Sequence, residues 1–207
     1  MKTIANLSST AGMIVLVCVI GHAAAQEKTE PKYSNIGLKL NLGLGSQDFP
    51  VEQDLEAGGA ASLSLGYGVS QRVTLWLGAQ SGSFKHEQRE ALHSDFVGLD
   101  LGLQYKLRPG ERLRPYGKVG VGAYFLGTNY NGTGLDAFRP GEVLSGGGVA
   151  WALGAEYRLT RFFTLGAEFY WKDFDYTQKR VGDGEFVNMP EAVPGNTRGF
   201  MLNFILH

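Results

Sequence analysis

The sequence is poor in cysteine, in charged residues and in long apolar runs. Its one cysteine, Cys18, lies near the N-terminus, so the remainder of the chain offers no disulfide, no thiolate nucleophile and no cysteine-based zinc site. Charged residues make up 19% of the 207 residues, and the net charge of −1 argues against nucleic acid as the main partner. A hydrophobic share of 43% is too high for a disordered chain. The composition therefore indicates one folded domain, or two very small ones.

The N-terminal segment has the pattern of an export signal. Lys2 supplies a positive charge, residues 11–20 are an apolar run of ten (AGMIVLVCVI), and residues 23–25 (AAA) fit a small-x-small cleavage site. This run is shorter than the roughly 18 to 20 apolar residues that a helical membrane anchor needs. Val17 is also a poor residue to precede a lipid-modified Cys18. We expect residues 1–25 to be a cleaved signal peptide, 26–32 a disordered polar lead-in, and 33–207 the folded domain.

The rest of the chain shows an alternation of apolar residues with polar residues or glycine. A period of two is typical of β-strands whose two faces differ. It recurs in eight segments, at 36–45, 60–69, 73–82, 96–107, 116–126, 148–159, 162–172 and 198–206. These segments predict an all-β domain.

The connections between these segments alternate in length. Short links are expected at residues 70–71, 108–115 and 160–161, and long polar loops at 46–59, 83–95, 127–147 and 173–197. This alternation predicts an eight-stranded antiparallel up-and-down barrel with both termini on the side of the short links. It is the layout of a transmembrane barrel with short periplasmic turns and long external loops.

The two faces of the strands suggest which one looks outward. In 96–107 the apolar face is Val97, Leu99, Leu101, Leu103, Tyr105 and Leu107, and the other face is Gly98, Asp100, Gly102, Gln104 and Lys106. Alternation alone also fits a soluble ligand-binding barrel with the apolar face inside. Glycine, however, suits the crowded interior of a small barrel. A closed barrel also pairs every backbone group, as lipid requires.

The positions of aromatic residues on the apolar face also indicate that this face looks outward. Tyr67, Tyr105 and Tyr157 precede the short links, and Phe125 and Trp171 lie near the long loops. Two such groups resemble the aromatic girdles that bound the apolar band of a membrane barrel. We therefore expect the apolar face to meet lipid.

Charged residues on the opposite face are expected to fill the interior. They are Lys39, Asp100, Lys106, Lys118, Glu156, Arg158, Glu168 and Lys172. Eight strands enclose just enough space for side chains, and buried charges are costly unless paired. We expect a salt-bridged plug in which Glu156 pairs with Lys118, and a narrow ion path through it is the alternative. Glycine pairs such as Gly66/Gly68 and Gly120/Gly122 are interpreted as space for bulky neighbours.

The last segment has the form polar-x-Gly-x-x-hydrophobic-x-aromatic, through Thr197, Gly199, Leu202 and Phe204. With residues 115–124, it makes residues 33–207 resemble the small eight-stranded outer-membrane β-barrel family of Gram-negative bacteria, of the OmpA/OmpX and opacity types. The resemblance implies an outer-membrane location with both termini in the periplasm. It also implies insertion by the barrel-assembly machinery and contact with outer-membrane lipid and lipopolysaccharide.

Function follows less directly from the residues. Some eight-stranded barrels modify lipid A, and the candidates for such chemistry are His93, Ser94 and Asp95, with His86 nearby. Consecutive strand residues point to opposite faces and are poorly placed to relay a proton. We therefore predict a non-enzymatic structural or surface-interaction protein that acts through its four external loops. The alternatives are a lipid A-modifying enzyme and a narrow ion-conducting pore.

Partners and cofactors are the least constrained. Lys179, Arg180 and Arg198 are candidate contacts for lipopolysaccharide phosphates. Dispersed histidines make no ligand set, so no metal and no cofactor are expected. The sequence does not identify a partner for the loops.

Overall fold

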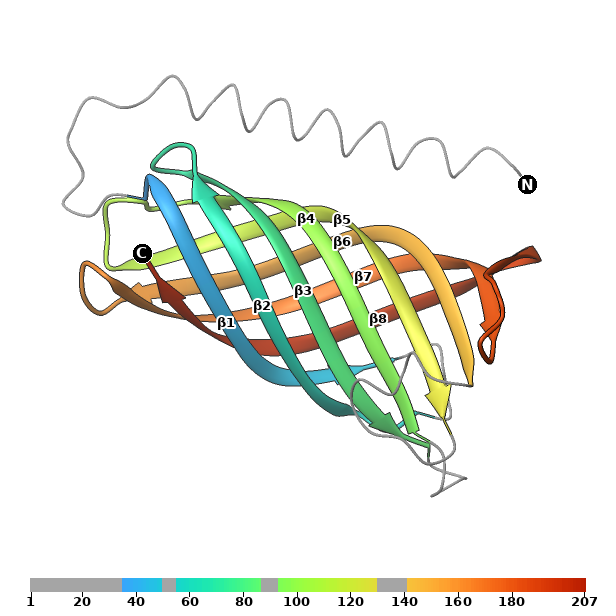
Figure 1. Cartoon of the computed structure of the whole chain (residues 1–207). Helices are drawn as coiled ribbons and strands as arrows, with labels where there is room; N and C mark the ends of the chain where they lie inside the picture. The colour runs from blue at the N-terminus through green and yellow to red at the C-terminus, as the bar shows by residue number, and fades with distance from the viewer. Residues whose placement is uncertain (1–34, 50–54, 87–92, 130–140) are drawn as a thin grey trace.

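Eight antiparallel strands close into a barrel in the order in which they occur along the chain (Figure 1). The computed structural model describes residues 35–49, 55–86, 93–129 and 141–207. The strands are β1 (Gly37–Asp48), β2 (Gly58–Gly68), β3 (Val73–Lys85), β4 (His93–Lys106), β5 (Leu113–Asn129), β6 (Glu142–Arg158), β7 (Phe163–Val181) and β8 (Val187–Leu206). β1 and β8 pair over residues 40–48 and 198–206 and so close the ring. The predicted eight-stranded up-and-down barrel is confirmed.

The two ends of the barrel differ in their connections. Residues 69–72, 107–112 and 159–162 link strands at one end, where β1 also begins and β8 ends (Figure 1). We call this the short-turn end and the opposite end the loop end. The predicted signal peptide (1–25) and lead-in (26–32) lie outside the described residues.

The predicted loop 173–197 is wrong, because most of it is a β-hairpin that continues β7 and β8. Asp173 pairs with Asn196 and Tyr176 with Val193, and a register shift follows between Tyr176 and Gln178. Gly182, in the turn, has φ +61°, which a residue without Cβ adopts at low cost. The strand continues because alternation does: Phe174 and Tyr176 stay on the inward face of β7 and are buried. The hairpin projects beyond the barrel (Figure 1).

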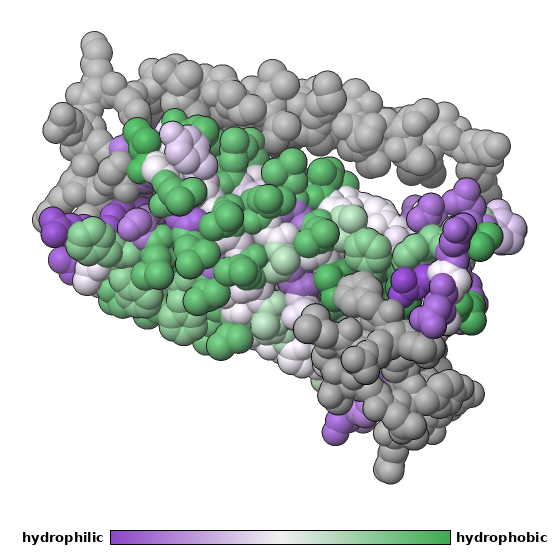
Figure 2. All heavy atoms as spheres, viewed as in Figure 1, coloured by the Kyte–Doolittle hydropathy of each residue, from purple (hydrophilic) through white to green (hydrophobic). Residues whose placement is uncertain are grey.

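The outer wall is apolar and the interior holds polar side chains, the reverse of a water-soluble domain. Leu38 is 69% exposed and Leu153 61%, whereas Lys39 is 2% exposed and Gln104 1%. Figure 2 shows hydrophobic side chains covering the visible barrel wall, with hydrophilic ones gathered mostly toward its two ends. So extensive an exposed apolar surface marks a site that another phase or molecule covers. Among the described residues, no helix is long and apolar enough to cross a membrane.

Glycine on the inward face makes room for large side chains. A Cβ on Gly66 would lie 2.6 Å from Cζ3 of Trp76, whose indole is buried. A Cβ on Gly122 would lie 2.5 Å from both Oδ1 of Asp100 and Oη of Tyr124. Gly66 and Gly122 therefore leave space for bulky side chains, as interpreted. The same interpretation is wrong for Gly68 and Gly120, because a Cβ there would meet backbone instead, at 1.8 Å from the Asn35 carbonyl oxygen and 2.6 Å from that of Leu101.

Candidate functional site

The interior near the short-turn end is a layer of buried charges. The Glu156 carboxylate, 1% exposed, accepts hydrogen bonds from Lys106 Nζ at 2.7 Å and from Gln104 Nε2 at 2.7 Å. Arg114 Nη2 lies 3.0 Å from the same carboxylate. Lys106 also donates to Asn35 Oδ1 at 2.7 Å. Asn35 Oδ1 accepts a second hydrogen bond from Lys39. The Glu156 carboxylate thus pairs with two buried cations, Lys106 and Arg114.

The expected pair between Glu156 and Lys118 is wrong. Lys118 Nζ instead lies 3.2 Å from Glu168 Oε2, and Glu156 pairs with Lys106 and Arg114. Arg114 escaped the sequence analysis because residues 108–115 were assigned to a connection. Arg114 could have been found because it lies four residues before Lys118, a spacing that puts both side chains on the inward face of β5. Pro115 points against this, since proline favours a strand that starts after it.

Two further ion pairs occupy the middle of the barrel. Glu168 pairs with Lys118 and accepts a hydrogen bond from Tyr116 Oη at 2.7 Å. Asp100 pairs with Lys172 at 2.6 Å and accepts from Tyr124 Oη at 2.7 Å. All four charges line a cavity of about 80 Å³ whose other walls include Ser62, Ser64, Gly78, Gly102 and Ala150. A cavity of this volume has room for a few water molecules.

Arg158 is buried beside the turn between β6 and β7. Its guanidinium Nε donates to the carbonyl of Thr160 at 3.0 Å, so it holds the turn between β6 and β7. Every charged residue expected on the inward face therefore lies inside the barrel. Lys39, Lys106 and Glu156 are near the short-turn end, the four paired charges line the central cavity, and Arg158 is beside the β6–β7 turn.

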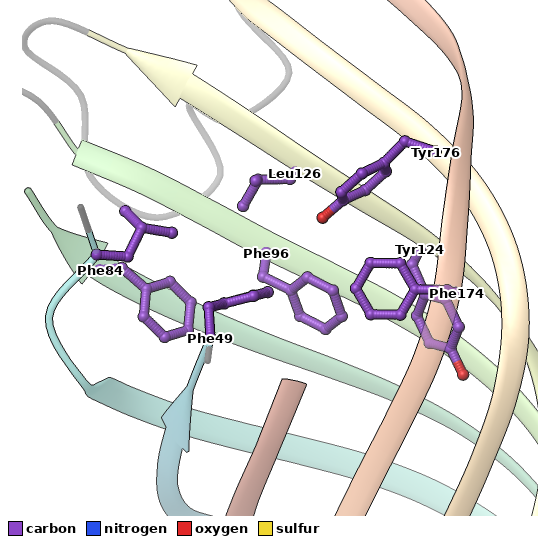
Figure 3. Packing of buried hydrophobic residues seen from close by; sticks show 8 residues of the cluster. Phe49, Phe84, Phe96, Tyr124, Leu126, Phe174 and Tyr176 are labelled. Carbon is purple, nitrogen blue, oxygen red and sulfur yellow. The ribbon is translucent and has the colours of Figure 1, made fainter. Parts of the chain in front are cut away.

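An aromatic cluster fills the loop end of the interior, and the sequence analysis missed it. Ring centroids are 4.7 Å apart for Phe49 and Phe84, 5.9 Å for Phe96 and Tyr124, and 4.7 Å for Tyr124 and Phe174. The buried members are Phe49, Leu55, Phe84, Phe96, Tyr124, Leu126, Phe174 and Tyr176 (Figure 3). We call these eight buried residues the aromatic plug. Lys172 Nζ, 5.2 Å from the Tyr124 ring centroid, borders the plug on the side of the central cavity.

The aromatic residues expected in girdles lie on the outer wall. Tyr67, Tyr105 and Tyr157 are each the penultimate residue of their strand at the short-turn end. Tyr67 and Tyr157 are exposed, and Tyr105 Oη accepts a hydrogen bond from Arg72 Nη1 at 3.0 Å. Phe125 and Trp171 lie toward the loop end and pair across strands with Ser145 and Trp151, respectively.

The proposed assembly segment lies in β8, at the seam with β1. Leu202 and Phe204 are exposed on the outer wall. Thr197 is buried, and its Oγ1 donates to the Asp48 carbonyl at 2.9 Å. Gly199 lies against Tyr170, whose Oη would be 2.4 Å from an added Cβ. The segment thus places its polar residue and glycine inward and its apolar residues outward.

The candidate catalytic residues are arranged differently from their order in the sequence. Ser94 Oγ lies 2.9 Å from Nε2 of His86 across the β3–β4 hairpin, and 3.0 Å from Thr128 Oγ1. His93 belongs to the opposite face of β4. Ser94 is 1% exposed and faces the interior beside the aromatic plug. A serine–histidine contact exists, but its hydroxyl is closed off from the outer wall. In the described part of the chain, no group of three His, Cys, Asp or Glu is placed to hold a metal.

Acidic neighbours accompany two of the cations expected to meet lipopolysaccharide. Lys179 Nζ lies 2.8 Å from Glu142 Oε2, and Arg198 Nη2 lies 3.2 Å from Asp48 Oδ2. The Arg180 guanidinium lies over the Phe186 ring, 5.1 Å from its centroid. All three are on or near the loop end.

Comparison with known proteins supports an assignment of this fold. Residues 13–187 match the family model described as outer membrane protein beta-barrel domain. No curated protein matches the sequence. Among solved structures, neisserial surface protein A has a TM-score of 0.56 at 10% identity, covering 82% of this chain and 94% of that one.

Two other solved structures of outer-membrane proteins are similar in fold over most of both chains. OprG from Pseudomonas aeruginosa has a TM-score of 0.53 at 14% identity, covering 86% of this chain and 98% of that one. Ail, the attachment invasion locus protein of Yersinia pestis, has 0.50 at 12%, covering 83% and 97%. At such identities the likeness concerns the fold alone.

Proposed function

Since this chain belongs to the outer membrane protein β-barrel family, we propose that it is a non-enzymatic, non-conducting barrel of the Gram-negative outer membrane. It acts through the surface at its loop end, as a membrane-stabilising or surface-interaction protein. The proposed orientation puts both termini and the short turns in the periplasm. Short periplasmic turns and longer external loops are the general arrangement of such barrels.

The observation that carries the proposal is the filling of the interior. The charged layer around Glu156 and the aromatic plug around Phe96 lie at opposite ends of the lumen, with the cavity of about 80 Å³ between them. Both Glu156 and Phe96 are essentially inaccessible to solvent. A filled lumen leaves the exterior as the place where the protein acts.

The β7–β8 hairpin is the largest described feature of that exterior at the loop end. Val181 and Val187 are each 66% exposed, and charged Lys179 and Glu142 flank them. Exposed apolar residues with a charged rim are typical of a surface that contacts another molecule. Loops and projecting segments on a rigid barrel commonly carry function.

Cysteine labelling in intact cells tests the orientation. The chain after residue 18 contains no cysteine, so Asp183→Cys in the hairpin turn and Glu111→Cys in a short turn each introduce a single thiol. We expect a membrane-impermeant maleimide to label Asp183→Cys in intact cells and Glu111→Cys only after the outer membrane is permeabilised. The reverse pattern would contradict the proposed orientation.

A lipid A-modifying enzyme is the second candidate, because Ser94 and His86 form a 2.9 Å contact of the kind that activates a nucleophile. Mass spectrometry of lipid A from cells with and without the gene separates the two functions. Unchanged lipid A agrees with the non-enzymatic proposal. An acyl chain lost in the presence of the gene, and retained with Ser94→Ala, would replace it.

A further inference from the structure

A groove of about 250 Å³ lies on the outer wall near the loop end, where β7, β8 and β1 meet. Its lining includes Ser46, Asp48, Phe169, Trp171, Arg198 and Phe200. The cross-strand register places Trp171 opposite Arg198, and Phe169 opposite Phe200. The groove therefore crosses the seam that closes the barrel, on the wall that faces lipid.

A step in side-chain size creates this groove. The outward face of β1 carries leucine at positions 38, 40, 42 and 44, and then changes to Ser46. Opposite Ser46 on β2 is Gly59, which adds no side chain. On the other side of the seam, β7 and β8 carry large aromatic rings, with the Phe169 and Phe200 centroids 5.2 Å apart. A hollow forms where the leucine ladder stops.

The chemistry of the groove changes along its length. The Phe169–Phe200 pair and Trp171, which is 41% exposed, form apolar walls. Arg198 lies opposite Trp171, one outward-facing position beyond Phe200 toward the loop end, and Leu202 and Phe204 follow Phe200 on the outer wall. The Arg198 side chain is 60% exposed. Arg198 thus places a positive charge at the loop-end limit of the apolar run of β8.

The ion pair with Asp48 does not block Arg198. Nε and Nη2 both donate to a single oxygen, Oδ2 of Asp48, at 3.3 and 3.2 Å. A guanidinium has five N–H donors, so donors remain for an incoming oxyanion. An exposed pair of this kind contributes little stability, and guanidinium matches the geometry of phosphate.

We propose that this groove is a binding site for lipid A, with one acyl chain along Phe169 and Phe200 and a glucosamine phosphate on Arg198. The proposal rests on the proposed function, because the groove opens to the lipopolysaccharide leaflet only if the loop end is external. Asp48 balances the charge of Arg198 within the groove, so the free N–H donors of Arg198 and the apolar walls below it are what identify an amphiphile with an oxyanion in its headgroup. The external leaflet makes that amphiphile a phosphorylated glycolipid.

Native mass spectrometry of the purified barrel in detergent tests this site, with hexa-acyl lipid A and phosphatidylglycerol as probes. Arg198→Gln removes the phosphate contact, and Ser46→Leu continues the leucine ladder into the groove while leaving Arg198 in place. The matched controls are Arg108→Gln, in a comparably exposed pair with Glu111 at the other end of the barrel, and Ala123→Leu on the outer face of β5. Heat-modifiable gel mobility verifies that each variant is folded.

We expect the wild type and both controls to bind lipid A alike, and Arg198→Gln to bind about tenfold more weakly, the size of one charge-assisted hydrogen bond. Ser46→Leu should also weaken binding, because its side chain occupies the space of the acyl chain. Unchanged binding by both test variants would overturn the site. A loss with Arg198→Gln but not with Ser46→Leu would also overturn it, because charge attraction without the groove would then suffice. Equal binding of phosphatidylglycerol would overturn the choice of lipid A. None of these results depends on orientation in cells, which the cysteine labels report separately.

Discussion

At the short-turn end the barrel interior is packed with ion pairs around Glu156, whereas at the loop end it is packed with aromatic rings around Phe96. Both regions exclude solvent from the same narrow lumen. The charged layer needs each partner, since a buried charge without its counter-ion is costly. The aromatic plug needs volume and shape, because its members interact by packing. The two ends should therefore respond differently to substitution.

The largest effect is expected from Glu156→Leu. The variant leaves Lys106 and Arg114 buried without their carboxylate, which costs about 3–5 kcal/mol in other proteins. We expect the urea midpoint of unfolding in detergent to fall accordingly. Glu142→Leu is the control, since its pair with Lys179 is exposed. An unchanged midpoint for Glu156→Leu would refute the charged layer.

The next largest effect is expected from Phe96→Ala in the aromatic plug. Phe96 is 0% exposed and contacts Phe49, Tyr124 and Phe174. Truncating a buried phenylalanine costs about 3 kcal/mol or somewhat more. Phe96→Leu should recover most of this loss, because it restores apolar volume. If Phe96→Leu were as unstable as Phe96→Ala, packing would not explain the plug.

A smaller effect is expected from Lys118→Met, which lies between the two regions. The Lys118 side chain is 24% exposed, and its partner Glu168 keeps the hydrogen bond from Tyr116. Because this pair is only partly buried and Glu168 keeps that donor, we expect a loss of about 1 kcal/mol in the free energy of unfolding. A loss as large as that for Glu156→Leu would mean that the charged layer extends through the middle of the barrel.

The fold could be predicted from the sequence because period-two alternation is visible within each strand. It does not depend on which strands pair with each other. Leu99, Leu101 and Leu103 share a face in any register, so strands and faces were predictable. The hairpin beyond Asp173 was missed because Asp173, Asp175 and Lys179 made a polar stretch look like a loop, although Phe174 and Tyr176 kept the alternation.

The interior was less predictable than the strands. The alternation along each strand identified which charged residues face inward. Which of them form ion pairs depends on the register between strands, and this register brings Lys106 and Arg114 to Glu156, and not Lys118. Phe96 and Tyr124 lie on the inward face of predicted strands, yet the cluster also draws on Phe49 and Phe174, outside those strands. Only closure of the barrel brings these four rings together.

Planar-bilayer recording of the refolded protein tests the closed lumen most directly. The account predicts no unitary current steps from the wild type. It also predicts none from Phe96→Ala, because the charged layer still closes the short-turn end. Resolved, reproducible current steps from the wild-type barrel would contradict the account and favour a narrow pore.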